Sequence, residues 1–332
     1  MPPSLGVPKP VTDLKAVRKG SNVTLTWTTP TESTDGELLR KPGKMIVLRA
    51  IGLRPFQPVT QVTLPPALAE RHPSTATATD SLSSVLLSAP TESFVSYSVS
   101  SQTQSGRVDG SSNKVEIPTV PTLPPPQSLR ATLSPDGVSL SWQGSSLPQA
   151  STELQNQYIY RVMRRLEGSR EPVTVGQVTP APGSLSYIDK TVTWENTYQY
   201  WITPVTIWAG QGRTGEVEGD DSSPLSVFVH DTFPPAIPAG LQAVYSGIAQ
   251  HPAIDLTWTP NTETDLAGYN VYRINTRGEA QKLNSVLVKT PAFHDLNVQP
   301  GNKYVYAVSA VDLRGNESGR SESTSETVLN PQ

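Results

Sequence analysis

The sequence predicts an all-β protein made of three tandem domains. Three times, a segment that begins with a proline runs into a short alternating strand that ends on a tryptophan, at residues 10–27, 126–142 and 238–258. The tryptophans follow one another at intervals of 115 and 116 positions, the size of a small domain. Proline makes up 32 of 332 residues, which argues against long helices because proline breaks a helix interior.

The third repeat has the clearest strands. Residues 254–258 alternate apolar and polar side chains, as a half-buried strand does. Residues 269–273 and 304–310 have the same character, and Pro300-Gly301 is a turn signal just before the second of them. Period-two spacing places the apolar residues of each strand on one face. The repeat therefore predicts antiparallel strands that bury one face of a sheet.

Five motifs of this repeat occur together. They are Pro238-Ala-Gly-Leu241, the strand-ending Trp258, Asp265-Leu-Ala-Gly-Tyr269-Asn-Val-Tyr-Arg273, Tyr304-Val-Tyr-Ala-Val-Ser-Ala310 and Asp312-Leu-Arg-Gly-Asn-Glu-Ser318. Together they resemble bacterial fibronectin type III domains, over nearly all of residues 233–329. The resemblance implies an immunoglobulin-like β-sandwich in which Trp258 packs between the sheets and Tyr304 makes the corner hydrogen bond of the sixth strand.

The other two repeats fit the same scheme less closely. In the second, Trp142 and Tyr198 take the core and corner positions, and the interval from Asp189 to Tyr198 equals the nine positions from Asp295 to Tyr304. In the first, Trp27 takes the core position. Val95 stands where the corner tyrosine is expected, so the corner bond of that domain is absent or replaced.

The predicted organisation is three immunoglobulin-like sandwiches of the fibronectin type III kind, joined by proline-rich linkers. The segments are a flexible N-terminus at 1–9, domain 1 at 10–118, a proline-rich linker at 119–125, domain 2 at 126–230, a linker at 231–237 and domain 3 at 238–329. Because prolines favour extended polyproline II, we expect the first linker to be semi-rigid and to hold domains 1 and 2 apart.

Composition excludes several classes of function. The 26 basic and 29 acidic residues are spread without long runs, so we expect no nucleic-acid partner. The chain has no cysteine, which rules out disulfides and thiolate metal sites. No apolar stretch approaches the roughly 20 residues of a membrane-spanning helix. The N-terminus lacks a signal-peptide pattern, so either the protein is cytoplasmic or this chain begins after its export signal.

Sequence motifs of catalysis do not occur. The four histidines are scattered without metal-ligand spacing, at His72, His230, His251 and His294. Asp220-Asp221 is either a calcium-binding turn or a solvated acidic turn, and the second interpretation is favoured because the spacing matches no defined calcium loop. We therefore expect no enzyme activity, no cofactor and no metal.

Three tryptophans of domain 2 are the candidate ligand-binding residues. If Tyr198 faces the core, Trp201 points outward from the same strand. Trp194 lies in the turn before that strand and Trp208 just beyond it, so the three rings are candidates for an aromatic platform that binds sugar rings or a protein. The alternative, which we favour, is that they pack against neighbouring strands or an adjacent domain.

Three hypotheses of function follow. The first is a monomeric, non-catalytic binding or spacer array outside a bacterial cell, in the envelope or secreted, which contacts an unknown protein or glycan at the surface. One version is a lipoprotein whose anchoring cysteine is missing from this chain. The second is an accessory region of a larger carbohydrate-active enzyme. The third is an intracellular scaffold.

Overall fold

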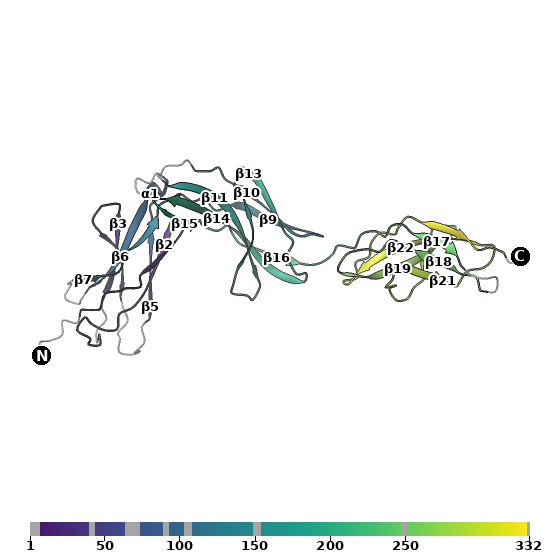
Figure 1. Ribbon diagram of the computed structural model, residues 1–332, viewed down its shortest axis with the longest axis horizontal. Helices are drawn as coiled ribbons and strands as arrows, with labels where there is room; N and C mark the ends of the chain where they lie inside the picture. Colours follow the sequence, from purple (N-terminus) through teal and green to yellow (C-terminus); the bar gives the residue numbers. More distant parts are fainter. Residues whose placement is uncertain are drawn as a thin grey trace. The chain divides into compact units, whose positions relative to one another are not determined.

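The computed structural model describes residues 7–39, 44–63, 74–88, 93–102, 108–148, 154–246 and 251–330. This part of the chain is built of β-strands and one short helix, α1 (Ser84–Ser88), which confirms the all-β class (Figure 1). The chain divides into two compact units, Met1–Val229 and His230–Gln332. No helix within the described ranges is long and apolar enough to cross a membrane.

The second unit is a single sandwich, domain 3, coloured green to yellow in Figure 1. One sheet has the order β17-β18-β21, with bounds Gln242–Tyr245, Ile254–Thr257 and Ala292–Asp295. The other has the order β20-β19-β22-β23, with bounds Ala280–Lys282, Leu266–Ile274, Lys303–Asp312 and Thr324–Thr327. All neighbours are antiparallel.

The first unit contains two sandwiches with the same arrangement of strands. In domain 1 the small sheet has the order β1-β2-β5, with bounds Lys15–Lys19, Asn22–Thr28 and Thr75–Ser81. Its large sheet has the order β4-β3-β6-β7, with β8 also paired to β6 and bounds Gln57–Thr63, Lys44–Ile51, Phe94–Gln102, Val108–Ser111 and Val115–Pro118.

Domain 2 repeats this pattern. Its small sheet has the order β13-β10-β9, with bounds Gly183–Asp189, Gly137–Gly144 and Gln127–Ser134. Its large sheet has the order β12-β11-β14-β15, with β16 also paired to β14 and bounds Val173–Val178, Gln155–Leu166, Asn196–Gly210, Arg213–Glu218 and Leu225–Val229. A parallel pairing of Lys19 in β1 with Glu218 in β15 joins this sheet to the small sheet of domain 1, so that the two form one eight-stranded sheet. Each domain therefore pairs its first, second and fifth elements in one sheet and the remaining strands in the other.

A buried tryptophan lies at the centre of each domain core. Trp27, Trp142 and Trp258 are 2%, 1% and 5% exposed. In domains 2 and 3 a tyrosine ring of the facing sheet meets the indole edge to face, with the centroids of Trp142 and Tyr160 separated by 6.2 Å and those of Trp258 and Tyr269 by 5.1 Å. Such edge contacts add to the stabilisation from burial.

The corner tyrosines bond to the backbone just before their strands. Tyr198 accepts a hydrogen bond from Thr193 N at 3.0 Å, and Tyr304 accepts one from Gln299 N at 2.9 Å. In domain 1 the corresponding Val95 is fully buried in the core cluster. At this position domain 1 therefore has apolar packing, whereas domains 2 and 3 have a tyrosine hydrogen bond.

An arginine, an aspartate and a tyrosine tie the two sheets together in every domain. These triads are Arg49–Asp80–Tyr97, Arg164–Asp189–Tyr200 and Arg273–Asp295–Tyr306. The arginine and tyrosine are direct register partners on the large sheet, whereas the aspartate ends or nearly ends a strand of the small sheet. The tyrosine hydroxyls donate to the aspartates at 2.7, 2.9 and 2.7 Å.

Burial keeps the tyrosine hydroxyl protonated in each triad, so that it can donate to the aspartate. It raises the pKa of Tyr97, Tyr200 and Tyr306 far above the usual range, and the hydrogen bond to the neighbouring aspartate adds to the effect. The aspartate side chains are 11%, 0% and 4% exposed in chain order. Each carboxylate therefore depends on the arginine and tyrosine to replace the water that it loses on folding.

Part of the predicted flexible N-terminus and the predicted linker 231–237 are bonded to their domains. Val7 is buried and accepts a hydrogen bond from Thr34 N, and Lys9 N donates to Glu32 O. The expectation of a flexible segment over residues 1–9 is therefore wrong for 7–9, while residues 1–6 lie outside the described part. In the predicted linker 231–237, Asp231 O accepts a hydrogen bond from Asn316 Nδ2 at 3.1 Å, so this segment is held by domain 3.

We predict that Asp295→Ala destabilises the His230–Gln332 unit by about 3 kcal/mol, the lower end of the range for breaking a buried ion pair, because Arg273 keeps 22% exposure. Tyr306→Phe removes one hydrogen bond and should cost about 1 kcal/mol. The measurement is calorimetric unfolding of this unit.

The matched control is Asp255→Ala in the same domain. Asp255 pairs with His294, but both side chains are about half exposed, so we expect a loss below about 1 kcal/mol. Equal losses for Asp255→Ala and Asp295→Ala would show that the triad does not tie the sheets.

Candidate functional site

Trp208 lies at a junction between domains 1 and 2. It is 5% exposed and belongs to an apolar cluster with Val120, Leu154 and Val217. Phe94 of domain 1 meets the indole edge to face, with 5.4 Å between the ring centroids. The cluster therefore joins the end of one sandwich to the side of the next.

The segment 119–125 is part of this junction. Val120 and Leu123 are almost fully buried, and Pro121 O accepts a hydrogen bond from the Thr206 hydroxyl at 2.9 Å. The expectation that these prolines form a spacer that holds the domains apart is therefore wrong. The apolar residues between the prolines draw the segment into contact with both domains.

Arg18 fastens the same segment from domain 1. Its guanidinium donates to the carbonyls of Gly20, Pro118 and Val120 at 2.8, 2.7 and 2.9 Å. Burial lowers the pKa of Arg18 to about 10, so the side chain still carries its charge at neutral pH. At the rim, Lys19 pairs with Asp221 at 2.6 Å. Charge-assisted hydrogen bonds and apolar packing thus both stabilise the junction between domains 1 and 2.

The three candidate tryptophans do not share one face. The register between β11 and β14 runs from Gln155–Ala209 to Leu166–Tyr198 without a shift, so side chains alternate without interruption. Trp201 therefore points outward, whereas Trp208 lies on the inward side with Tyr200 and enters the junction. Trp194 is half-buried against the domain 2 core. Only Trp201 remains on the outward face of the sheet.

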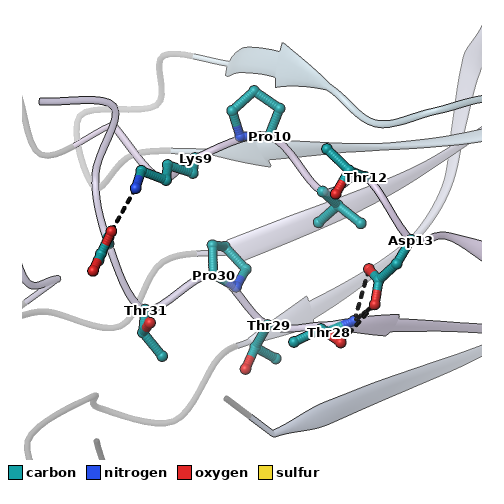
Figure 2. Close-up of a pocket in the computed structure, with 10 residues that line it drawn as sticks. Lys9, Pro10, Thr12, Asp13, Thr28, Thr29, Pro30 and Thr31 are labelled. Carbon is teal, nitrogen blue, oxygen red and sulfur yellow. Dashed lines mark hydrogen bonds and ion pairs between the residues drawn. The ribbon is translucent and has the colours of Figure 1, made fainter. Parts of the chain in front are cut away.

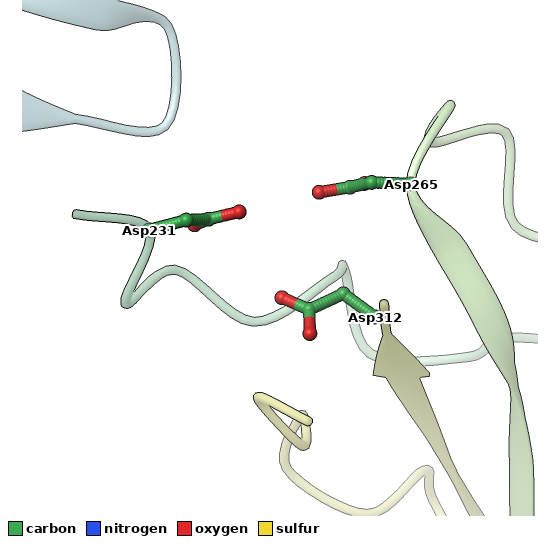
Figure 3. A group of neighbouring side chains, drawn as sticks. All are labelled: Asp231, Asp265 and Asp312. Carbon is green, nitrogen blue, oxygen red and sulfur yellow. The ribbon is translucent and has the colours of Figure 1, made fainter. Parts of the chain in front are cut away.

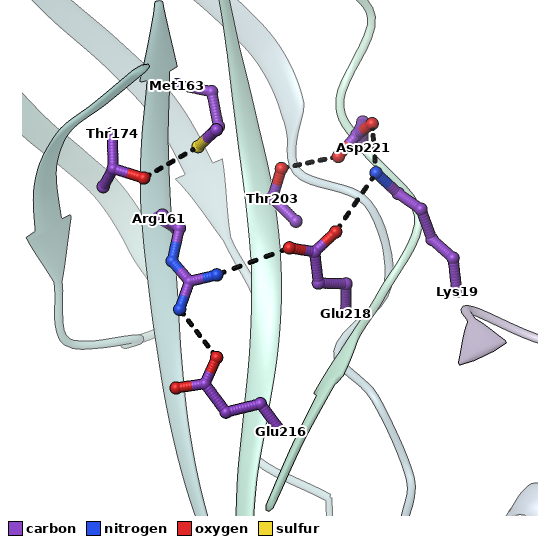
Figure 4. A network of polar contacts seen from close by, with 8 residues as sticks. All are labelled: Lys19, Arg161, Met163, Thr174, Thr203, Glu216, Glu218 and Asp221. Atoms are coloured by element: carbon purple, nitrogen blue, oxygen red, sulfur yellow. Dashed lines mark hydrogen bonds and ion pairs between the residues drawn. The ribbon is translucent and has the colours of Figure 1, made fainter. Parts of the chain in front are cut away.

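Around Trp201, the outward face carries a polar network, drawn in Figure 4. Arg161 pairs with Glu216 at 2.9 Å and with Glu218 at 3.3 Å. Thr203 donates to Asp221 at 2.5 Å. Asp221, which the sequence placed in a possible calcium turn or a solvated acidic turn, is thus bonded to Thr203 and Lys19.

A second candidate is an open pocket of about 380 Å³ in domain 1. It is lined by residues 9–13 and 28–32 (Figure 2). Asp13 accepts hydrogen bonds from Thr28 N and Thr28 Oγ1, and the side-chain bond is the main reason that the pKa of Asp13 lies below its usual value. Lys9 pairs with Glu32 at 2.5 Å. The charged groups of Asp13, Lys9 and Glu32 are therefore already bonded to other residues that line the pocket.

A third candidate is a group of carboxylates in domain 3. Oxygens of Asp231, Asp265 and Asp312 lie within 4.8 Å of one another (Figure 3). Oxygen ligands of this kind suit calcium, but main-chain amides already bond to two of the side chains. Asp312 accepts hydrogen bonds from Arg314 N and Asn316 N at 2.8 Å, and Asp231 accepts one from Phe233 N at 3.1 Å. Asn316 links the two segments, because its Nδ2 donates to Asp231 O at 3.1 Å and to Asp312 Oδ2 at 2.8 Å.

Glu317 follows directly in that loop and bonds to the outward side of the large sheet. It accepts hydrogen bonds from Asn270 at 2.9 Å and from Tyr272 and Ser309 at 2.5 Å. Burial alone would raise the pKa of Glu317, but the hydrogen bonds outweigh it and the pKa is lowered. The ionised carboxylate therefore stabilises the loop.

Comparison with known proteins finds similarity to short stretches of much longer enzymes. No protein-family model matches the chain. Exoglucanase B of Cellulomonas fimi is 27% identical over 225 residues, 64% of this chain and 17% of that protein. Amylopullulanase of Thermoanaerobacterium thermosulfurigenes is 43% identical over 66 residues, 20% of this chain and 3% of that protein. The chain spans less than one fifth of the length of the curated relatives that it matches.

Two solved structures are similar to the chain at low TM-score. The chicken CNTN1 FN1-FN3 domains have 15% identity and a TM-score of 0.29, over 97% of this chain and 100% of theirs. An Fn3-like protein from Clostridium thermocellum has 29% identity and a TM-score of 0.25, over 30% of this chain and 95% of its own. By its motifs and its strand orders, the chain is similar to a tandem array of fibronectin type III domains.

We predict that Trp208→Ala loosens the junction between domains 1 and 2, because truncating a buried tryptophan costs about 3–5 kcal/mol. Hydrogen exchange measured by mass spectrometry should increase in the 119–125 segment. Trp208→Phe keeps a ring against Phe94 and should have a smaller effect. Unchanged exchange in Trp208→Ala would show that the cluster does not hold the segment.

We predict that Glu317 makes the stability of domain 3 depend on pH in acid. Because its pKa is lowered on folding, its contribution is complete above the ordinary glutamate pKa of about 4.3 and is lost as the pH falls through the folded value. The difference in melting temperature between the wild type and Glu317→Gln should therefore be constant above about pH 5 and shrink below about pH 4. A difference that is the same at pH 3 and pH 6 would contradict this role.

Proposed function

We propose that this chain is a non-catalytic accessory region of a bacterial carbohydrate-active enzyme that works outside the cytoplasm. The observation that carries the proposal is the match over 64% of the chain to a small part of Exoglucanase B. Short matches to two amylopullulanases support the same assignment. In proteins of that size a three-domain segment is one part of a larger polypeptide.

The use of the charged side chains is consistent with a non-catalytic role. Among the described residues, the most buried carboxylates are bonded to arginine, tyrosine or main-chain amides, as in Asp189, Asp295 and Asp312. Each of these contacts holds strands or a turn together. A catalytic carboxylate instead faces a cleft in which a substrate can reach it.

A free-standing surface array, with or without a lipid anchor, was the first hypothesis from the sequence. It differs from the present proposal in one observable, which is whether the same polypeptide also contains a catalytic domain. An intracellular scaffold differs in its location. The test therefore determines the full reading frame and the cellular fraction in which its product is found.

We expect a glycoside hydrolase domain in the same reading frame and the product in the culture medium or envelope. Deleting the array from that enzyme should leave turnover of a short soluble oligosaccharide unchanged. On an insoluble polysaccharide, activity should fall by about tenfold if the array adds binding contacts. A reading frame without a catalytic domain, or a product confined to the cytoplasm, would overturn the proposal.

A further inference from the structure

We infer that the outward face of β11 and β14 in domain 2 binds a neutral glucan chain, with Trp201 as the ring on which a sugar stacks. The inference deepens the proposed function and rests on it, because it names the surface and the ligand class of the accessory region. We call this surface the Trp201 strip. It consists of Arg161, Met163, Arg165, Gln199 and Trp201, which are partly exposed, and of Thr203, which is 2% exposed and forms the buried end of the strip.

Strand register places these six side chains in a regular grid. The direct partners are Met163 with Trp201, Arg161 with Thr203, and Arg165 with Gln199. Directly opposed side chains on one face of an antiparallel pair are neighbours, with Cβ atoms about 5 Å apart. An apolar pair is therefore flanked on each side by one arginine and one neutral polar residue.

The ring of Trp201 is not needed for the core. The core cluster of domain 2 includes Tyr200 and Ile202, on either side of it, and does not include Trp201. Its side chain is half-buried among its neighbours on the sheet surface. A large flat ring in the middle of a polar sheet face is a typical anchor for a ligand, because it offers apolar area with little loss of side-chain entropy.

Charge pairing on this face favours a neutral ligand. Arg161 is shared by Glu216 and Glu218, and Lys19 is shared by Glu218 and Asp221. A polyanion would have to compete with these carboxylates for Arg161 and Lys19. Arg165 donates to Gln199 at 2.5 Å, which leaves an amide and a guanidinium with donors and lone pairs suited to hydroxyl groups.

The domain 1 pocket is the weaker alternative for the same ligand. Its hydroxyl and charged groups suit polar contacts, but no aromatic residue is among those that line it. A sugar there would have hydrogen bonds and no stacking surface. The Trp201 strip offers both, as ligand sites generally do when apolar area is combined with a few directed polar groups.

The test measures binding of the full 332-residue chain by isothermal titration calorimetry, with cellohexaose and maltohexaose as probes. Binding of at least one probe is expected, and the stronger of the two distinguishes a β-linked from an α-linked glucan. Trp201→Ala should weaken that binding by about tenfold or more, equivalent to about 1.4 kcal/mol. Trp201→Phe should retain most of the affinity.

Two further variants keep the result interpretable. Gln199→Ala keeps the tryptophan and should weaken binding severalfold, which supplies a test if Trp201→Ala does not fold. Ile188→Ala is the matched control, because Ile188 is 42% exposed on β13, in the other sheet of the same domain. It should bind as the wild type does.

Failure of this inference is distinguishable from failure of the proposed function. Wild-type affinity in both Trp201→Ala and Gln199→Ala, or equal loss in Ile188→Ala, would overturn the Trp201 strip. Absence of binding to either hexasaccharide would also overturn it. Each of these results leaves the reading frame and cellular location, which decide the proposed function, unaffected.

Discussion

The ion pair between an arginine and an aspartate, closed by a tyrosine hydroxyl, is the contact on which each sandwich depends. It joins the two sheets at the edge of the core, and it requires a fixed register. The arginine and tyrosine must be direct partners on the large sheet, as in Arg164 and Tyr200, and the aspartate must face them from the small sheet. Slipping one strand by a single residue would turn its member of the triad to the opposite face. A buried ion pair adds little net stability, so its main effect is to specify one arrangement.

A fixed frame allows the same fold to acquire different neighbours. In domain 3 the central strand β22 has 10 residues, whereas the corresponding β14 of domain 2 has 15. The first half of β14 carries the corner tyrosine and the triad tyrosine, as β22 does. Its extension carries Trp208 out of the domain 2 core and into the junction with Phe94. The extra residues of β14 therefore form part of a contact between domains at one end of the sandwich.

The sequence predicts those features of the structure that follow from local patterns and regular spacing. It does not predict contacts between residues that are far apart in the chain. The spacing of the tryptophans predicts three domains, and the equal intervals before Tyr198 and Tyr304 predict their corners. The triad of domain 1 escapes such reasoning, because Asp80 precedes Tyr97 by 17 positions whereas Asp189 precedes Tyr200 by 11. The alternation of β14 predicts the outward Trp201 but not the fate of Trp208, since Pro204 suggests that the strand ends earlier. Composition also does not distinguish a solvated proline segment from a buried one. In residues 119–125, Val120 and Leu123 are the apolar residues whose burial draws the segment into the junction.

The junction gives a physical reason why a single binding face in domain 2 is sufficient for an accessory role. Arg18, Trp208 and the 119–125 segment hold domains 1 and 2 as one body, so the Trp201 strip keeps one orientation relative to domain 1. The orientation of that face relative to domain 1 is therefore set before any ligand binds. The outward residues are also outside the triads and the core, so they can be adapted to a ligand without loss of register. An array of this design separates the residues that specify the fold from those available for recognition.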